Sequence, residues 1–211
     1  TSRLVGSEMC IRDRFYNDQI DNQTKVFKLE GKEHIHIKKV LRKKEGQIVK
    51  FTNGNSYCFS TRIISILEKE SNFEIISKTK FENPPFLHIA ISLLKSQTRF
   101  EIFLEKAVEI GVSEITPLIC ERSQKKNMNI KRSKKILISA LKQSHKYYLP
   151  KLNEPQNFKC LVEKNKEENK LIATCEDYKK KEIIKLYNTK KNNLIMIGPE
   201  GDFTINELEI A

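Results

Sequence analysis

Apolar and polar residues alternate in the first part of this chain and follow a different rhythm in the second part. In the strand-like segments between residues 47 and 77, every second side chain lies on the same face, which is typical of half-exposed β-strands. The strands predicted there are Gln47–Phe51, Ser56–Leu67 and Phe73–Ser77. Asn53-Gly54 lies between the first two, and this pair favours a hairpin because both turn residues take a positive φ. This part therefore predicts a small β-rich domain.

One helix is expected inside the β-rich part, over Lys32–Lys44. Ile37, Val40 and Leu41 share one face of it, and Gly46 lies where such a helix should end. Five of the seven residues from 38 to 44 are basic, which indicates a surface that binds phosphates. A solvated helix face is the alternative. The candidate phosphate-binding residues here are Lys38, Lys39, Arg42 and Lys43.

After Asn83-Pro84-Pro85, strands alternate with helices, which predicts a mostly parallel sheet. Phe86–Leu94 is typical of a buried strand, and Thr98 with Glu101 forms a capping box for a helix that ends before Gly111. Further strands are predicted at Ile115–Cys120, Leu171–Thr174 and Leu194–Ile197, and further helices at Lys131–Tyr147 and Asp177–Tyr187. The domains predicted are a β-rich domain over residues 14–82, a linker over 83–85 and an α/β domain over 86–211.

The Gly-Pro-Glu-Gly sequence at Gly198–Gly201 organises this second part. Leu194–Ile197 before it predict a strand buried on both faces, and Thr204 with Glu207 after it makes another capping box, so a helix should begin there. Such a turn places main-chain groups at the carboxyl end of a sheet strand, where open α/β sheets bind ligands. It lacks the glycine patterns of phosphate-cradling and dinucleotide loops. An ordinary connection between strand and helix is the alternative interpretation.

The chain contains 39 Lys and Arg against 27 Asp and Glu, a net charge of +12, which favours a polyanionic partner. A compositional bias of the genome is the alternative, but the distribution of charge decides against it. Residues 122–146 contain nine Lys or Arg and no Asp or Glu, which indicates a nucleic-acid-binding surface. The candidates in this window are Arg122, Lys125, Lys126, Lys131, Arg132 and Lys146, together with Gln143 and Ser144.

Other classes of protein are disfavoured by what the sequence lacks. Five cysteines are scattered without a Cys-x-x-Cys pair, which fits reduced thiols in a cytoplasm better than disulfides or zinc. His34 and His36 alternate without a supporting Cys or carboxylate pattern, so no metal site is predicted. No apolar run approaches the roughly 20 residues of a membrane span, and no signal peptide is recognised. A soluble, cytoplasmic protein is therefore expected.

The two ends of the chain carry expectations of their own. Residues 1–13 show no periodicity and are interpreted as a non-native tail. The chain stops at Ala211, within the helix that Thr204 is expected to begin, so a missing C-terminal segment is expected.

An ordered set of short motifs resembles a bacterial enzyme family. The motifs are Val40–Arg42 with Gly46, Glu105–Val112, Ile115–Leu118, Glu121–Ser123, Lys142–Ser144 and Ile197–Gly201. Together they cover nearly all of residues 14–211 and resemble the ribosomal RNA small subunit methyltransferase E family, the 16S rRNA (uracil-N3) methyltransferases. The resemblance implies a PUA-like β-barrel, a SPOUT-type α/β domain with a trefoil knot, and S-adenosylmethionine as the methyl donor. It also implies 16S rRNA of the small ribosomal subunit as the substrate, and a homodimer.

The resemblance assigns the cofactor to two loops at strand ends. The implied cofactor-binding residues are Thr174, Cys175 and Glu176 in one loop, and Ile197, Gly198, Pro199, Glu200 and Gly201 in the other. Gly201 is expected to require glycine, because the turn needs a positive φ or a close approach of ligand and backbone. The family usually has a further glycine where Asp202 stands here, and a carboxylate before a helix suits the helix dipole. The family's final Leu-Gly-x-Arg-Ile-Leu-Arg segment is absent, so the knot is expected to be incomplete.

Methyl transfer to uracil N3 requires that the N3 proton be removed or the resulting anion be stabilised. The sequence identifies no catalytic base. Glu200 is a formal candidate, although a role in capping or in orienting the loop is favoured. Two alternatives stay open: another SPOUT RNA methyltransferase that acts on tRNA or on a ribose 2′-hydroxyl, and a non-catalytic RNA-binding protein.

Overall fold

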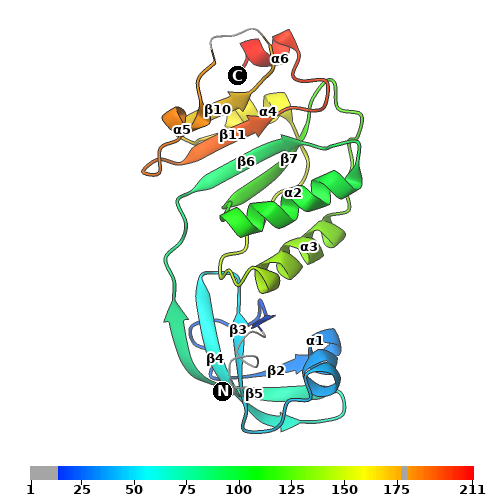
Figure 1. The fold of residues 1–211 in the computed structure, drawn as a ribbon, viewed down its shortest axis with the longest axis vertical. Coiled ribbons are helices and arrows are strands. Elements are labelled where there is room, and N and C mark those ends of the chain that lie inside the picture. The colour runs from blue at the N-terminus through cyan, green and yellow to red at the C-terminus, as the bar shows by residue number, and fades with distance from the viewer. Residues whose placement is uncertain (1–13, 177–179) are drawn as a thin grey trace, which may run out of the picture. The chain divides into compact units, whose positions relative to one another are not determined.

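The computed structural model describes residues 14–176 and 180–211, which fold into two compact units (Figure 1). The first unit contains the described residues up to Glu82 together with Leu141–Tyr148. The second unit contains Asn83–Ala140 and Leu149–Ala211. Residues 1–13, interpreted above as a non-native tail, lie outside the described residues.

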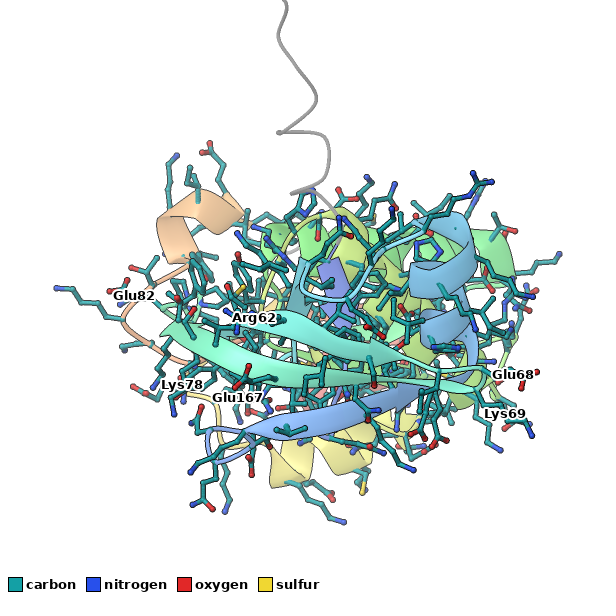
Figure 2. All side chains as sticks on the ribbon, turned by 90° about the horizontal axis from the view of Figure 1, so that it is seen from below. Arg62, Glu68, Lys69, Lys78, Glu82 and Glu167 are labelled. Carbon is teal, nitrogen blue, oxygen red and sulfur yellow. The ribbon has the colours of Figure 1, made fainter. Side chains whose placement is uncertain are left out.

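The first unit is built on one five-stranded sheet with the strand order β1-β3-β4-β5-β2. Its strands are β1 (Arg14–Tyr16), β2 (Val26–Glu30), β3 (Ile48–Thr52), β4 (Tyr57–Ile66) and β5 (Glu70–Lys80). Neighbouring strands are antiparallel except for the pair β1 and β3. β3 and β4 pair as the predicted hairpin, but of the two expected turn residues only Gly54 has a positive φ, 78°. Asn53 does not, and the second positive φ, 63°, belongs to Ser56. Figure 2 shows the hairpin of β4 and β5 with Glu68 and Lys69 at its tip and Glu82 at its other end.

Aromatic side chains fill the core of this unit because alternate positions of the strands turn inward. Phe51, Phe59 and Phe73 are each fully buried, and Phe27 stacks on Phe73 with ring centroids 5.2 Å apart. Phe15 of β1 joins the same cluster. The core accounts for the alternating pattern that predicted these strands.

The helical segment of the first unit is shorter and wider than predicted. It consists of α1 (Gly31–Ile35) and a π-helical turn (His36–Val40), and Arg42 beyond it has a φ of 49°. The Leu41 N–H donates to the His36 carbonyl five residues back, and this wider turn rotates the residues that follow. Ile37 is buried as expected, but Val40 is 64% exposed, so the predicted apolar face is wrong at that position.

The second unit contains a parallel sheet with the order β10-β11-β6-β7-β8, and β9 also pairs with β7. The strands are β6 (Leu87–Ser92), β7 (Glu114–Ile119), β8 (Lys151–Leu152), β9 (Gln156–Asn157), β10 (Asn169–Ala173) and β11 (Asn193–Ile197). β11 is flanked on both sides, and its residues from Asn193 to Met196 are buried. The predicted parallel sheet with a doubly covered strand at residues 194–197 is confirmed.

Five helices accompany this sheet in the part of the chain that the structure describes. They are α2 (Gln97–Ile110), α3 (Ile130–Gln143), α4 (Phe158–Lys164), α5 (Ile183–Leu186) and α6 (Ile205–Glu209). α2 runs along β6 and β7 (Figure 1) and buries Phe100, Leu104 and Val108. α3 begins in the second unit, and its residues from Leu141 onward belong to the first unit.

Three helix boundaries differ from the predictions. Ser96, rather than Thr98, caps α2, because its hydroxyl accepts the Arg99 N–H and the side chain of Glu101 is engaged elsewhere. The helix predicted to reach Tyr147 ends at Gln143, and His145 has a φ of 57°. Of the helix predicted over Asp177–Tyr187, only the single turn of α5 is present among residues 180–187, and residues 177–179 lie outside the described residues.

Candidate functional site

The turn after β11 has the geometry of a fixed loop. The Asp202 N–H donates to the Pro199 carbonyl at 3.0 Å, which closes a four-residue turn. Thr204 then caps α6: its hydroxyl accepts the Glu207 N–H, and the Glu207 carboxylate accepts the Thr204 N–H at 2.9 Å. The predicted capping box is therefore confirmed. Phe203, between the turn and the cap, is fully buried and packs on Phe158 with ring centroids 5.0 Å apart.

The positive φ that was expected at Gly201 lies at another residue of this turn, while the expected close approach of ligand and backbone at Gly201 stays a prediction. Gly201 does not have a positive φ, and a Cβ there would meet Arg122 Cδ at an ordinary 3.6 Å. A Cβ on Gly198 would lie only 3.0 Å from the Phe203 ring, so the packing of Phe203 excludes a side chain there. The positive φ, 62°, belongs to Asp202, which stands where the resembled family usually has glycine. Asp tolerates this left-handed conformation better than most residues do.

The carboxylate of Asp202 connects the two loops that were predicted to hold a cofactor. It accepts hydrogen bonds from the Thr174 hydroxyl at 2.9 Å and from the Cys175 N–H at 2.6 Å, beyond the end of β10. It also accepts the Phe203 N–H at 2.7 Å. Burial would raise the pKa of Asp202, but these hydrogen bonds outweigh it and lower the pKa. The structure therefore brings the two predicted loops together at the carboxyl ends of β10 and β11.

Two further carboxylates fix the neighbouring strand ends. Glu200 accepts the Lys95 N–H at 3.0 Å, just after β6, and Glu207 accepts the Glu121 N–H at 2.9 Å, just after β7. Hydrogen bonds from the main-chain N–H groups of Glu200 itself and of Lys95 lower the pKa of Glu200. A carboxylate that is stabilised in its ionised form is a weaker base, so Glu200 orients the loop, as the sequence favoured.

Arg122 reaches the same turn from the loop after β7. Its guanidinium donates to the Gly201 carbonyl at 2.7 Å and to the Phe203 carbonyl at 3.2 Å. Side chains or main-chain groups that follow all four long parallel strands therefore meet around one turn. Arg122 was predicted to bind RNA phosphates, and in this structure its guanidinium holds the main chain of the turn.

A cleft of about 470 Å³ lies beside this turn, at the carboxyl end of β7. Its lining includes Ile119, Glu121, Phe158, Asn206 and Glu207, a mixture of apolar and polar groups. The volume is in the range of small-molecule sites. The predicted cofactor-binding residues are not among its lining residues, although Glu207 and Glu121 belong to the hydrogen bonds that surround the turn.

The predicted phosphate-binding residues of the second unit differ in whether their charged groups are engaged in ion pairs. Lys125 and Lys131 line one open hollow of about 590 Å³ together with Gln97, and Lys126 is exposed. Arg132 makes two hydrogen bonds to the Glu101 carboxylate, at 2.6 and 2.9 Å, which lowers the pKa of Glu101 to about 2. The structure thus gathers Lys125 and Lys131, while it engages Arg132 in an ion pair.

The remaining candidates lie in the first unit. Lys39, Arg42 and Lys146 are exposed, and Lys43 is half-buried. Lys38 donates to the Leu67 carbonyl at 2.8 Å, which ties the helical segment to the β4–β5 hairpin. Gln143, the last residue of α3, is exposed and Ser144 beyond it is half-buried. Residues 122–146, the acid-free window that contains no Asp or Glu, are therefore divided between the two units and do not form one surface of a single unit.

Comparisons with protein families, with individual proteins and with solved structures agree on one family. Residues 81–211 match the RNA methyltransferase domain family, and residues 29–76 match the RNA methyltransferase PUA domain family. Ribosomal RNA small subunit methyltransferase E of Mesomycoplasma hyopneumoniae is 32% identical over 183 residues, which are 83% of this chain and 77% of that protein. The enzyme of the same name from Rickettsia conorii is 28% identical over 93% of this chain and 81% of its own length.

This chain belongs to the ribosomal RNA small subunit methyltransferase E family. Solved structures agree with that membership. A probable rRNA-methyltransferase from Porphyromonas gingivalis superposes with a TM-score of 0.84 at 29% identity, over 94% of this chain and 84% of that one. A Legionella pneumophila methyltransferase structure that contains the cofactor SAM gives 0.77 at 28% identity, over 93% of this chain and 84% of that one. The fold is a PUA-like curled β-sheet followed by a SPOUT-type α/β domain.

Sequence reasoning missed the residues that join the loops in this family member. Asp202 was interpreted as a tolerated partner of the helix dipole, whereas its carboxylate connects β10 to β11. Lys95 was not singled out, because it contributes only a main-chain N–H, which leaves no signal in a sequence. A glycine replaced by Asp is itself a signal, since Asp is among the few residues that adopt a positive φ.

A second polar cluster in the α/β domain lies at the opposite edge of the sheet. His88 is buried, with Nδ1 2.5 Å from Glu167 Oε1 and Nε2 2.7 Å from Thr116 Oγ1. Asn153 donates to Thr116 and to Glu114. These side chains line a cleft of about 420 Å³ at the amino ends of β6 and β7. Thr116 is fully buried and its hydroxyl is shared by two partners, so the cluster joins the strand starts to the segment before β10.

Proposed function

We propose that this protein transfers a methyl group from S-adenosylmethionine to N3 of a specific uridine in 16S rRNA of the small ribosomal subunit. The observation that supports it most is the 32% identity to a ribosomal RNA small subunit methyltransferase E, over 77% of that protein's length. The turn at Gly198–Gly201, connected to the loops after the neighbouring strands, supplies a site at the edge of the sheet where such folds bind ligands.

The donor set around the turn suits this cofactor. S-adenosylmethionine supplies a methyl group on a positively charged sulfur, which is an electrophile. The main chain at Ile197–Gly201 and at Thr174–Glu176 brings polar groups to the ends of β11 and β10, without the phosphate cradle that a nucleotide needs. The Cys175 N–H and the Gly201 carbonyl are engaged within the loops, and the main-chain groups beside them can hold an adenosine and an amino-acid end. Asp202 and Glu200 keep those two segments in place through main-chain hydrogen bonds. The residues present therefore fit the cofactor.

The chain's contribution to the chemistry is orientation and charge. Uracil N3 carries a proton and attacks only when that proton is lost, so the site must favour the anion. Arg122 places a cation at the turn, through its hydrogen bond to the Gly201 carbonyl, and its positive charge favours an anionic base there. Glu200, with its lowered pKa and its hydrogen bond to Lys95, maintains the shape of the loop. Alignment of the two reacting atoms supplies much of the rate in such a transfer.

The basic residues of both units serve the RNA. Lys125, Lys126 and Lys131 in the second unit and Lys39, Arg42 and Lys146 in the first hold phosphates, since each has its charge exposed or lines an open hollow. Binding of this kind falls steeply with salt, because each phosphate contact releases counterions.

A methyl group on N3 blocks the base-pairing edge of uracil, and this gives a direct test. Small subunits from cells that lack the modification are incubated with the protein and S-adenosylmethionine, and the 16S rRNA is then copied by reverse transcriptase. The proposal predicts one new stop, at one nucleotide before a uridine. A ribose 2′-O-methyl product leaves the base-pairing edge free and gives no such stop at ordinary nucleotide concentrations. Methylated 16S rRNA without the stop would therefore contradict the proposal.

A further inference from the structure

A three-layer stack of planar side chains lies outside the core of the first unit. The Phe81 and Tyr147 rings are nearly parallel, at 10°, with centroids 3.9 Å apart, and the Arg14 guanidinium carbon lies 4.1 Å from the Tyr147 centroid. Both neighbours lie within about 4 Å of one ring, so they must occupy its two opposite faces, since on one face they would overlap. The order is therefore Arg14, Tyr147, Phe81, with Phe81 as the outer layer.

The outer layer is open to solvent. Phe81 follows the last residue of β5 and is 39% exposed, whereas the other phenylalanines of this unit belong to its core. Tyr147 covers one face of the Phe81 ring, so the apolar surface that stays exposed includes the opposite face. Its second face is the same size as a nucleobase and has the chemistry that unpaired bases stack on.

Main-chain hydrogen bonds hold the two backbone segments that carry these rings. Ser56 makes both of them: its carbonyl accepts the Phe81 N–H at 2.7 Å, and its N–H donates to the Tyr147 carbonyl at 2.8 Å. Arg14 also donates to the His145 carbonyl, which fixes the guanidinium below the stack. A platform that is already ordered loses little conformational entropy when a ligand binds.

The net charge of the first unit favours an anionic ligand. Lys80 and Lys146, the neighbours in sequence of Phe81 and Tyr147, are both exposed, and Glu82 is the acidic residue that follows. The described residues of this unit include 16 Lys and Arg against nine Asp and Glu. In Figure 2, Lys78 and Glu82 lie toward the end of the hairpin away from its tip.

We propose that the exposed face of Phe81 is a stacking platform for one unpaired nucleobase of the RNA substrate, with exposed lysines of the same unit, such as Lys80 and Lys146, for the flanking phosphates. This inference rests on the proposed function, because it requires that the protein bind RNA. It adds a substrate class: the first unit engages a single-stranded or splayed-out nucleotide, and an A-form duplex alone does not satisfy the site. Stacking is tolerant of base identity, so this contact gives affinity without reading sequence.

The test compares variants of the full chain with an unstructured oligoribonucleotide of about 12 nucleotides that carries 2-aminopurine, a base whose fluorescence falls on stacking. Phe81→Leu keeps an apolar side chain but removes the ring, and Phe81→Trp restores an aromatic face. Ile64→Ala is the matched control, since Ile64 is 47% exposed near the tip end of β4. Melting curves of all variants report on folding.

The platform predicts that Phe81→Leu binds the oligonucleotide roughly 5- to 150-fold more weakly and loses the quenching, with the salt dependence unchanged. Phe81→Trp and Ile64→Ala should bind like the wild type. Equal binding by Phe81→Leu and wild type would overturn the platform and leave the proposed function standing. Equal weakness of the Leu and Trp variants would also overturn it. Failure of the wild type to bind any RNA at low salt would contradict the proposed function, and the platform with it.

Discussion

At the scale of single residues, the loop around Gly198–Gly201 depends on which positions lack a side chain and which carry a carboxylate. Gly198 is required because the Phe203 ring occupies the space that a Cβ would take. Asp202 adopts the positive φ and uses its side chain to hold the neighbouring loop, so one residue supplies both the turn conformation and a hydrogen-bonding carboxylate.

A matched pair of alanine variants tests this reading. Gly198→Ala places a Cβ 3.0 Å from the buried Phe203 ring, and overpacking of this kind costs about 1–3 kcal/mol of unfolding free energy. Gly201→Ala meets only Arg122 at 3.6 Å and should change stability by less than about 0.5 kcal/mol. Denaturant unfolding of the two variants measures the difference. Equal stabilities, or a larger loss for Gly201→Ala, would show that the packing of Phe203 does not determine the turn.

At the scale of elements, much of the fold could be predicted because the hydrophobic patterns were long or flanked by strong turn signals. β4, β11 and α2 have alternating, continuous or helical apolar patterns, and Gly54 and Gly111 mark ends where the backbone φ is positive. The boundary errors have local causes. A π turn after Ile35 shifted the apolar face, and Ser96 competed successfully with Thr98 for the cap of α2.

The site could be predicted only in part, for a different reason. The residues of the two loops were found because glycine turns after buried strands leave a clear pattern. The hydrogen bonds that connect these loops could not be predicted, because bonds to the main chain of Lys95 and Cys175 depend on which strands become neighbours. The pairing of Arg132 with Glu101 likewise depends on α2 and α3 packing together, 31 residues apart in sequence.

That ion pair between α2 and α3 gives a pH prediction. The pKa of Glu101 in the folded chain is lowered from 4.5 to about 2, chiefly by the hydrogen bond from Arg132. A lowered pKa stabilises the fold above about pH 4.5, and this contribution disappears as the pH falls toward 2. Glu101→Gln should therefore be less stable than wild type at pH 6 and equal to it near pH 2, as measured by thermal unfolding. Glu109→Gln, which removes an exposed pair with Lys106 further along α2, should show a smaller difference. A Glu101→Gln deficit that persists unchanged at pH 2 would contradict the pairing.

At the scale of the whole molecule, the protein combines a PUA-like sheet and a SPOUT-type domain. No helix in the described ranges, 14–176 and 180–211, is long and apolar enough to cross a membrane. The basic residues are distributed over both units. RNA affinity should therefore be a property of the intact chain and should depend on charge at several places.

Charge reversal at Lys125, Lys131 and Lys134 tests the part of this surface in the second unit. If these lysines bind phosphates, the triple change to Glu weakens binding to small subunits or rRNA. It also lowers the slope of log affinity against log salt by about 0.7 for each phosphate that the variant no longer neutralises. The control reverses Lys159, Lys170 and Lys185, which are exposed outside the acid-free window and change the net charge equally. An equal effect of both triple variants would indicate that only overall charge matters.

The central claim, methylation of uracil N3 in 16S rRNA, is tested most directly by identifying the product. Small subunits that lack the modification are incubated with the protein and S-adenosylmethionine carrying a labelled methyl group, and the rRNA is digested to nucleosides. The account predicts label in 3-methyluridine, in an amount of up to one methyl group per subunit. Label in a 2′-O-methylated or 5-methylated nucleoside, or no label in the 16S rRNA, would contradict it.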